Sequence, residues 1–422
     1  MIEFRMPWRN ESEEGYRRIA MVRDRLQWEK EQGISGYYHL PETEEGLIGR
    51  VESLARDGLP REVETLAVIG IGGSSLGAKA IDRALRVGRP DIKELLFLEN
   101  TDPLDIAEKF ARIDRERTLF LLISKSGGTI ETLSIFRAAV AHFDLKIAGR
   151  DRRRIWVVTD EGSPLWSFAR HYDLEHFAVP SNVGGRFSVL SAVGLVPLTL
   201  AGYDTRSLLK GAAAYGRRFW SDLEDLLLHK ALFLAEHRER YPMNVLFAYG
   251  SCLEDLSAWY VQLWGESLGK ISESGEQRGL TPLGQIGSVD QHSFLQLIVQ
   301  GPQDKTVTFL KVKEFGRDLP IPALELKYLE SSAYVEGSSL GMLLEAECDA
   351  TYESVRRHGV PTDMIVLDRL DEEHLGELIY HYELLTSATA AILEVDPYDQ
   401  PGVEEGKQIL KERFRQISGT KD

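Results

Sequence analysis

Short apolar runs, each followed by a segment with helical spacing, recur through the first half of the chain. They are TLAVIGIG (65–72), ELLFLEN (94–100), TLFLLISKSG (118–127), RIWVVTD (154–160) and HFAVP (176–180). A strand covered on both faces is continuously apolar, and strands that alternate with helices form a parallel sheet. The pattern therefore predicts an α/β fold with a doubly wound parallel sheet.

The pattern restarts after a mainly helical stretch from Ala192 to Tyr241. The runs NVLFAYG (244–250), FLQLIVQG (294–301), TVTFLKV (306–312) and DMIVLDRL (363–370) predict the strands of a second α/β unit of related architecture. We therefore expect a helical N-terminal segment (1–60), a first α/β domain (61–190), a second α/β domain that includes the helical linker (191–400), and a charged C-terminal helix (401–422).

Length and charge limit the class of protein. The 422 residues are enough for two cores. The net charge of −16 argues against nucleic acid or an anionic membrane as a partner, because long-range repulsion would have to be overcome locally. The arginines between residues 150 and 154 have no interleaved aromatic residues, so we interpret them as the solvated start of a strand.

The compartment is predicted from what the sequence lacks. No apolar stretch approaches the ~20 residues of a membrane helix, and the N-terminus has no apolar core of a secretory signal. Cys252 and Cys348 are too few for a disulfide framework or a cysteine-based zinc site. These features predict a cytoplasmic protein with no membrane partner.

A polar loop, SKSGGT (124–129), follows the third apolar run and precedes a predicted helix. Apolar residues at Ile130, Leu133, Phe136 and Ala139 have helical spacing. A helix N-terminus has unpaired N–H groups and a positive dipole end, so hydroxyl and glycine residues there predict an anion site. The alternative is that Ser126 or Thr129 only caps the helix.

A second glycine-rich loop, GIGGSSLG (70–77), follows the first apolar run. From Gly70 the third glycine of a dinucleotide fingerprint would fall on Ser75, and the lysine of a P-loop is missing. Two such loops at the carboxyl ends of parallel strands lie where open α/β sheets bind ligands. Together they favour a small phosphate ester over a nucleotide.

Six segments carry a resemblance to a known family. They are GIGGSSLG, SKSGGTIET, NVGGRFSVLSAVG, LWGESLGK, DQHSF and YDQPGVEEGK, in this order. The chain resembles the glucose-6-phosphate isomerase (phosphoglucose isomerase) family from about Val68 to Lys407. The resemblance implies two sugar-isomerase (SIS) domains, a homodimer, no metal or other cofactor, and reversible conversion of glucose 6-phosphate into fructose 6-phosphate through an enediolate.

The resemblance also implies roles for single residues. Glu266 would be the base that moves the proton, and Leu263 and Trp264 beside it predict a partly apolar setting. Arg186 would stabilise the enediolate. His292, supplied by the neighbouring subunit, would open the sugar ring with Lys407. The residues implied for the phosphate are Ser124, Lys125, Ser126, Thr129 and Thr132, and those implied for the sugar are Gly73, Ser74, Glu131 and Gln400.

Alternative functions stay open from the sequence. One is an isomerase that also accepts mannose 6-phosphate, and another is a non-catalytic sugar-phosphate sensor that keeps the loops but loses the base. Glu266, Arg186, His292 and Lys407 together argue against the sensor. A nicotinamide-dependent dehydrogenase would require that the missing third glycine of the fingerprint be tolerated.

Overall fold

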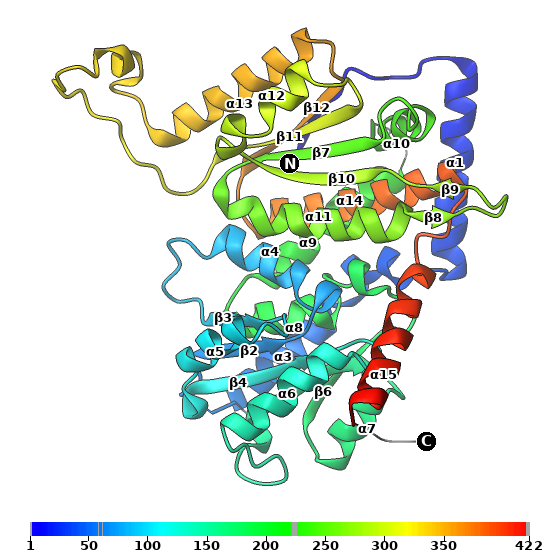
Figure 1. Ribbon diagram of the computed structural model, residues 1–422, viewed down its shortest axis with the longest axis vertical. Coiled ribbons are helices and arrows are strands. Elements are labelled where there is room, and N and C mark those ends of the chain that lie inside the picture. The colour runs from blue at the N-terminus through cyan, green and yellow to red at the C-terminus, as the bar shows by residue number, and fades with distance from the viewer. Residues whose placement is uncertain (1, 58, 61, 222–225, 419–422) are drawn as a thin grey trace.

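Two five-stranded sheets form the framework of the computed structural model, which describes residues 2–57, 59–60, 62–221 and 226–418 (Figure 1). The first sheet is entirely parallel and has the order β3-β2-β4-β5-β6. Its strands are β2 (Thr65–Ile69), β3 (Glu94–Leu98), β4 (Thr118–Ile123), β5 (Ile155–Asp160) and β6 (Glu175–Val179). These coincide with the five apolar runs, so the predicted α/β class is confirmed.

The second sheet has the order β1-β12-β11-β7-β10. Its strands are β1 (Glu3–Arg5), β7 (Met243–Tyr249), β10 (Thr281–Gly287), β11 (Lys305–Glu314) and β12 (Thr362–Arg369). All pairs are parallel except β1 with β12. The N-terminal segment, which we expected to be helical, thus begins with an edge strand of the second sheet. The sequence boundaries at residues 60, 190 and 400 stay predictions.

One predicted strand is wrong. Residues 295–300 of the run FLQLIVQG form the helix α12 (Leu295–Gln300), in which only Ile298 is buried. A short apolar run cannot be assigned to strand or helix by periodicity alone. The strand that precedes it is β10, which contains a proline and two glycines and therefore lacks the apolar pattern of a strand. Pro282 is tolerated because β10 is an edge strand.

Helices cover both faces of each sheet. Besides α12, the helices of the described residues are α1 (Glu13–Gln32), α2 (Leu40–Thr43), α3 (Glu45–Asp57), α4 (Leu76–Leu85), α5 (Pro103–Arg112), α6 (Ile130–His142), α7 (Pro164–His171), α8 (Ala192–Ala201), α9 (Thr205–Trp220), α10 (Leu226–Glu236), α11 (Glu254–Leu268), α13 (Leu340–Arg357), α14 (Glu372–Leu393) and α15 (Glu404–Ser418). Residues 1, 58, 61, 222–225 and 419–422, which belong to the predicted domains and terminal segments, lie outside the described residues.

The core follows the alternation of side chains along the strands. In β2, Leu66 and Val68 belong to a large core between the two sheets, whereas Ala67 and Ile69 belong to a core under the outer helices of the first sheet. A third core lies on the outer face of the second sheet. The central helix α14 is buried along almost its whole length, as expected for a helix between two sheets.

Two segments stand away from these layers (Figure 1). The arm, residues 319–340, projects beyond the second sheet and exposes Leu319, Tyr328 and Tyr334, the last with 87% of its surface accessible. The helix α15 follows a short turn after Gln400, and its residues 404–417 are all exposed, including Phe414 and Ile417. The C-terminal helix is therefore confirmed over residues 404–418, and it does not pack into the core of its own chain.

Candidate active site

The first polar loop joins β4 to α6, as the sequence predicts. Thr129 takes the N-cap position with extended backbone, yet its side chain forms no capping bond; its hydroxyl instead lies 3.0 Å from that of Ser124. Thr132, in the first turn of α6, is buried, and its hydroxyl has no partner among the described residues. A buried hydroxyl at an uncapped helix N-terminus is well placed to donate to an anion.

The rest of this loop is anchored to the neighbouring strand. The hydroxyl of Thr159 on β5 donates to the carbonyl of Ser124 at 2.7 Å. Lys125 donates to the carbonyl of Ser181 at 2.8 Å, and burial lowers its pKa while Asp160 opposes the shift. Ser126 is exposed and its hydroxyl accepts from the N–H of Gly128. The loop is therefore held in place by its backbone, with a lysine charge at its edge.

The second glycine-rich loop forms a short 3₁₀ helix, Gly72–Ser74, that packs backbone to backbone against another, Gly185–Phe187. A Cβ atom on Gly73 would overlap the carbonyl group of Gly185 and lie 2.8 Å from the nitrogen of Arg186. Only glycine permits this approach. The second glycine-rich loop, which follows β2, thereby fixes the position of Arg186. Ser74 ends this 3₁₀ helix and Glu131 lies in the first turn of α6, both with half-buried side chains.

Arg186 is 1% exposed, and the chain itself uses most of its donors. Its Nε atom donates to the hydroxyl of Ser267 at 2.6 Å, and Nη2 donates to the carbonyls of Pro397 and Asp399. Nη1 lies 3.4 Å from Oε2 of Glu266. Burial lowers the pKa of Arg186, and Glu266 opposes that shift. The guanidinium group is thus held rigidly, with one nitrogen turned to Glu266.

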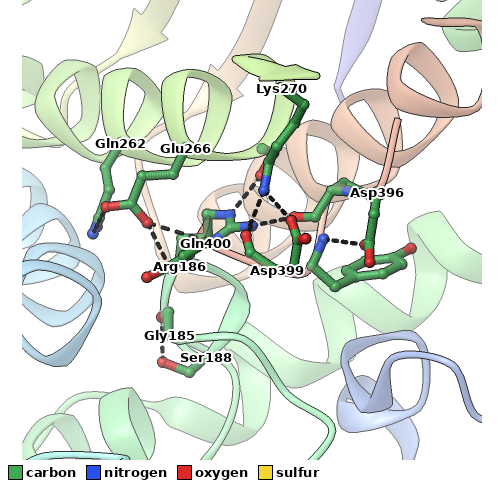
Figure 2. Close-up of polar contacts among 12 residues, drawn as sticks. Gly185, Arg186, Ser188, Gln262, Glu266, Lys270, Asp396, Asp399 and Gln400 are labelled. Carbon is green, nitrogen blue, oxygen red and sulfur yellow. Dashed lines mark hydrogen bonds and ion pairs between the residues drawn. The ribbon is translucent and has the colours of Figure 1, made fainter. Parts of the chain in front are cut away.

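Glu266 lies near the end of α11 and is surrounded by polar groups (Figure 2). Gln400 donates to its Oε2 at 2.9 Å, and Gln262 donates to its Oε1 at 3.1 Å. Leu263 and Trp264 are buried, and the indole N–H of Trp264 donates to Asn244 on β7. The expected apolar setting of Glu266 is therefore wrong, because its two apolar neighbours in sequence lie in the core.

The segment that carries Gln400 is fixed from several sides (Figure 2). Lys270, in the two-residue strand β8 (Lys270–Ile271) that pairs with β9 (Gln277–Arg278), donates to the carboxylate of Asp399 at 2.5 Å and to its carbonyl. The hydroxyl of Tyr398 donates to Glu29 on α1 at 2.8 Å. Arg186 and Lys270 thus share one carbonyl, so the backbone next to Gln400 has little freedom.

Two predicted residues are not brought to this cluster within one chain. His292 ends a short 3₁₀ helix after β10 and is exposed. Lys407, on α15, is also exposed and pairs with Glu404 at 2.6 Å. The structure therefore assembles Gly73, Arg186, Glu266 and Gln400, and leaves His292 and Lys407 on the surface.

Sequence reasoning missed several residues of this cluster. Gln262 could have been found, because it precedes Glu266 by one helical turn and such pairs interact. Ser267 and Lys270 lie in the quoted LWGESLGK segment, yet nothing in the letters connects them with Arg186 and Asp399. Those contacts depend on how residues 396–400 pass over the end of α11.

We searched the described residues for a metal site, a membrane-spanning helix and paired cysteines. No group of three or more His, Cys, Asp or Glu side chains gathers there in a way that could hold a metal ion. Within the same residues, no helix is both long and apolar enough to cross a membrane. Cys252 and Cys348 are free thiols, and burial raises the pKa of each.

Comparison with known proteins adds a family. Residues 47–421 match the model of the family described as phosphoglucose isomerase. The glucose-6-phosphate isomerase of Campylobacter jejuni is 41% identical over 395 residues, which cover 93% of this chain and 95% of that protein.

Solved structures agree with the sequence matches. A protein of Thermus thermophilus described as hypothetical superposes with a TM-score of 0.90 at 34% identity, covering 98% of this chain and all of the other. A glucose-6-phosphate isomerase of Chlamydia trachomatis superposes with a TM-score of 0.75 at 28% identity, covering 88% of this chain and 74% of that one.

Proposed function

This chain belongs to the phosphoglucose isomerase family, and from this premise we propose that the cluster around Glu266 is its active site. The chain interconverts glucose 6-phosphate and fructose 6-phosphate, a step of glycolysis. One observation carries the assignment of the site. A carboxylate, a buried guanidinium group and the amide of Gln400 converge where the glycine-rich loop of the first sheet meets α11 of the second half.

Glu266 is the base of the proposed mechanism. In the open-chain aldose, its carboxylate takes the proton from carbon 2, and the electron pair moves to form an enediolate with the carbonyl oxygen. The resulting carboxylic acid returns the proton to carbon 1, and the proton on the oxygen of carbon 2 passes to the oxygen of carbon 1, which gives the ketose. The aldose and the ketose are isomers, so no net oxidation occurs and the reaction needs only proton transfer.

Arg186 stabilises the negative charge of the enediolate. Its contacts with Ser267, Pro397 and Asp399 hold the guanidinium group before substrate arrives. A preorganised cation in a water-poor site stabilises developing charge without having to reorient. Gln400, which contacts the same carboxylate oxygen, lies at the sugar.

The loop between β4 and α6 holds the phosphate. The unpaired hydroxyl of Thr132, the neighbouring hydroxyls of Ser124 and Thr129, and the first N–H groups of α6 supply donors, while Ser126 and Lys125 close the edge. We assign Gly73, Ser74 and Glu131 to the sugar, as the family resemblance implies.

A second copy of the chain completes the site. His292 is exposed and outside the cluster in one chain, although ring opening calls for a group that can both give and take a proton. The apolar arm also lacks a covering surface within the described residues. We therefore assign a homodimer in which the partner supplies His292, with Lys407 acting beside the ring oxygen. The free thiols fit a reducing, cytoplasmic location.

Mannose 6-phosphate remains a candidate second substrate, since it differs from glucose 6-phosphate only at the carbon that Glu266 deprotonates. A non-catalytic sensor is disfavoured, because the base and its cationic partner are in contact.

The decisive experiment is Glu266→Gln. Isomerisation should fall by about 100- to 10,000-fold, the usual contribution of a general base. Exchange of the carbon 2 hydrogen of glucose 6-phosphate with deuterated water should nearly vanish, while binding of a substrate-like phosphate should persist. Exchange at close to the wild-type rate would show that Glu266 is not the base.

The shared site has its own test. Inactive His292→Ala and inactive Glu266→Gln chains, mixed after dissociation, should regain part of the activity in mixed dimers. No recovery in demonstrably mixed dimers would refute the proposal that His292 crosses between subunits.

A further inference from the structure

Three side chains meet at a buried carboxylate on α1. Glu29 is 5% exposed, and its Oε2 atom accepts from the hydroxyls of Tyr38 at 2.9 Å and Tyr398 at 2.8 Å. Its Oε1 atom accepts from Nε of Arg25, one helical turn earlier, at 2.8 Å. A buried charge is costly unless it is paired and hydrogen-bonded, and here both oxygens of the carboxylate have partners. Glu29 is therefore held in one orientation.

The tyrosine hydroxyls are the donors of this cluster. Burial raises the pKa of Tyr38 and of Tyr398 well above the ordinary tyrosine value, so both keep their protons. The two hydroxyl oxygens lie 2.9 Å apart, and that of Tyr398 also donates to Ser387 on α14 at 3.2 Å. The hydroxyl of Ser387 lies 2.7 Å from that of Tyr37. A buried polar network whose members all have partners is rigid.

Tyr398 connects this network with Arg186. It stands between Pro397 and Asp399, whose carbonyls both accept from Nη2 of Arg186 (Figure 2). Its ring centroid also lies 5.6 Å from that of Phe187, the residue after Arg186. The Tyr398 side chain therefore bears on the guanidinium group from two sides, through the carbonyls that the guanidinium contacts and through the next residue of the chain.

The carboxylate that anchors Tyr398 comes from outside the family match. The match begins at residue 47, whereas Glu29 and Tyr38 belong to the N-terminal segment. The family model therefore assigns them no role. A buried charge is not the most stabilising way to fill such a place, because well-packed apolar residues often stabilise at least as well. What the carboxylate adds is a fixed direction for the hydroxyl of Tyr398.

We propose that Glu29 and Tyr398 are positioning residues that hold Arg186 in place for the enediolate. The inference rests on the proposed function of Arg186 and adds the support that α1 gives it. Glu29 fixes the hydroxyl of Tyr398, and the backbone on either side of Tyr398 fixes the guanidinium group. The guanidinium group then meets the charge that develops on the substrate without having to reorient. Both residues act through Arg186 and not on the substrate.

The first test is Tyr398→Phe, which removes the hydroxyl and keeps the ring against Phe187. We expect kcat for fructose 6-phosphate to fall by about 10-fold, because small displacements of catalytic groups cost up to about 100-fold. KM should stay within about threefold, since Arg186 stabilises charge that is present in the transition state and not in the bound substrate. Unchanged kcat, or a change confined to KM, would overturn the proposal.

Tyr203→Phe is the matched control. The buried hydroxyl of Tyr203 donates to Oδ1 of Asp82 at 2.7 Å, and Asp82 pairs with Arg86 one turn along α4, as Glu29 pairs with Arg25 along α1. The two variants lose the same kind of contact, so the melting temperature should fall by a similar amount in both. In Tyr203→Phe, kcat and KM should match the wild type. An equal loss of kcat in the two variants would reduce the effect to general destabilisation and overturn the proposal.

Two substitutions of Glu29 test the other member of the pair. Glu29→Gln keeps one oxygen that can accept from the tyrosine hydroxyls, so kcat should stay within about threefold of the wild type. Glu29→Met keeps the length of the side chain and removes every acceptor, so its kcat should fall as in Tyr398→Phe. Wild-type kcat in Glu29→Met would overturn the proposal, even if Tyr398→Phe does not fold.

A double variant separates this inference from the function on which it rests. In the Arg186→Met background there is no guanidinium group to position, so Tyr398→Phe should cause little further loss of kcat. An equal loss in both backgrounds would mean that Tyr398 acts independently of Arg186, against the proposal. Wild-type kcat in Arg186→Met alone would instead refute the proposed role of Arg186, whatever Tyr398 does.

Discussion

The two α/β halves share a strand order, but the connection from the third strand to the next helix differs between them. In chain order, both sheets run second, first, third, fourth: β3-β2-β4-β5 in the first half and β10-β7-β11-β12 in the second. Residues 124–129 take β4 directly into α6, whereas residues 315–339, which include most of the arm, separate β11 from α13. The corresponding helix thus starts from a short polar loop in one half and from a long excursion in the other.

The N-termini of these two helices are satisfied in different ways. At α13, the hydroxyl of Ser339 accepts from the N–H of Met342 at 3.2 Å, and the carboxylate of Asp318 accepts from the N–H of Gly341 at 2.8 Å. At α6, the N-cap side chain forms no such bond and Thr132 keeps an unpaired hydroxyl within the described residues. Both halves therefore start a helix at this position, and among the described residues the first half leaves its helix start open.

The largest expected effect comes from Gly73, in the glycine-rich loop that follows β2. Gly73→Ala would force the backbone away from Gly185 and displace Arg186, because the added Cβ has no space. We expect kcat/KM to fall at least about 100-fold, since the guanidinium group would leave its position beside Glu266. Steady-state kinetics with fructose 6-phosphate measure this change.

A glycine that follows the first strand of the second half gives the contrast. Gly250 follows β7 with φ at 139°, and an added Cβ would lie 3.0 Å from the ring of Phe315. Gly250→Ala should lower the melting temperature through backbone strain and leave kcat/KM within about threefold. A similar loss of kcat/KM in both variants would mean that the two halves do not differ in function.

Much of this asymmetry could be predicted from the sequence. The loop SKSGGT has hydroxyl and glycine residues directly between an apolar strand and a helix, and the structure places Ser124, Thr129 and Thr132 together at the start of α6. Glu266 and Arg186, implied by the family resemblance, are in contact. These features depend on residues close together in the sequence, or belong to motifs that can be recognised as continuous segments of it.

The remainder depends on contacts that no local pattern encodes. Residues 294–301 are as apolar as a strand, yet residues 295–300 form α12, and the edge of the sheet beside β7 is taken by β10. The strand β1 was hidden because three residues carry no period and gain their structure from β12. The segment next to Gln400 is held by two contacts between residues distant in sequence. Lys270 binds Asp399, and Tyr398 binds Glu29.

A smaller effect is expected within the open loop itself. Ser126→Ala and Thr129→Ala each remove a hydroxyl proposed to contact phosphate, which binds equally in the ground and transition states. KM should therefore rise about 10-fold or more in each variant, with kcat nearly unchanged, as loss of a hydrogen bond to a charged group implies. Unchanged KM in both variants would mean that the loop is only a helix start, like that of α13.

The smallest effect should come from the closed counterpart in the second half. Ser339→Ala removes the N-cap of α13 and should lower the free energy of unfolding by about 1 kcal/mol, with kcat and KM unchanged.

The Ser339 hydroxyl and the Gly341 N–H hold the pKa of Asp318 below its usual value. Its stabilising contribution is therefore present above the ordinary aspartate pKa of about 3.9 and is lost as the pH falls through the lower folded value. The melting temperature of Asp318→Asn should accordingly lie below that of the wild type at pH 7, and the gap should close on acidification below pH ~3.9. A rise in KM for either variant would show that the second half also handles substrate, and the contrast between the halves would then fail.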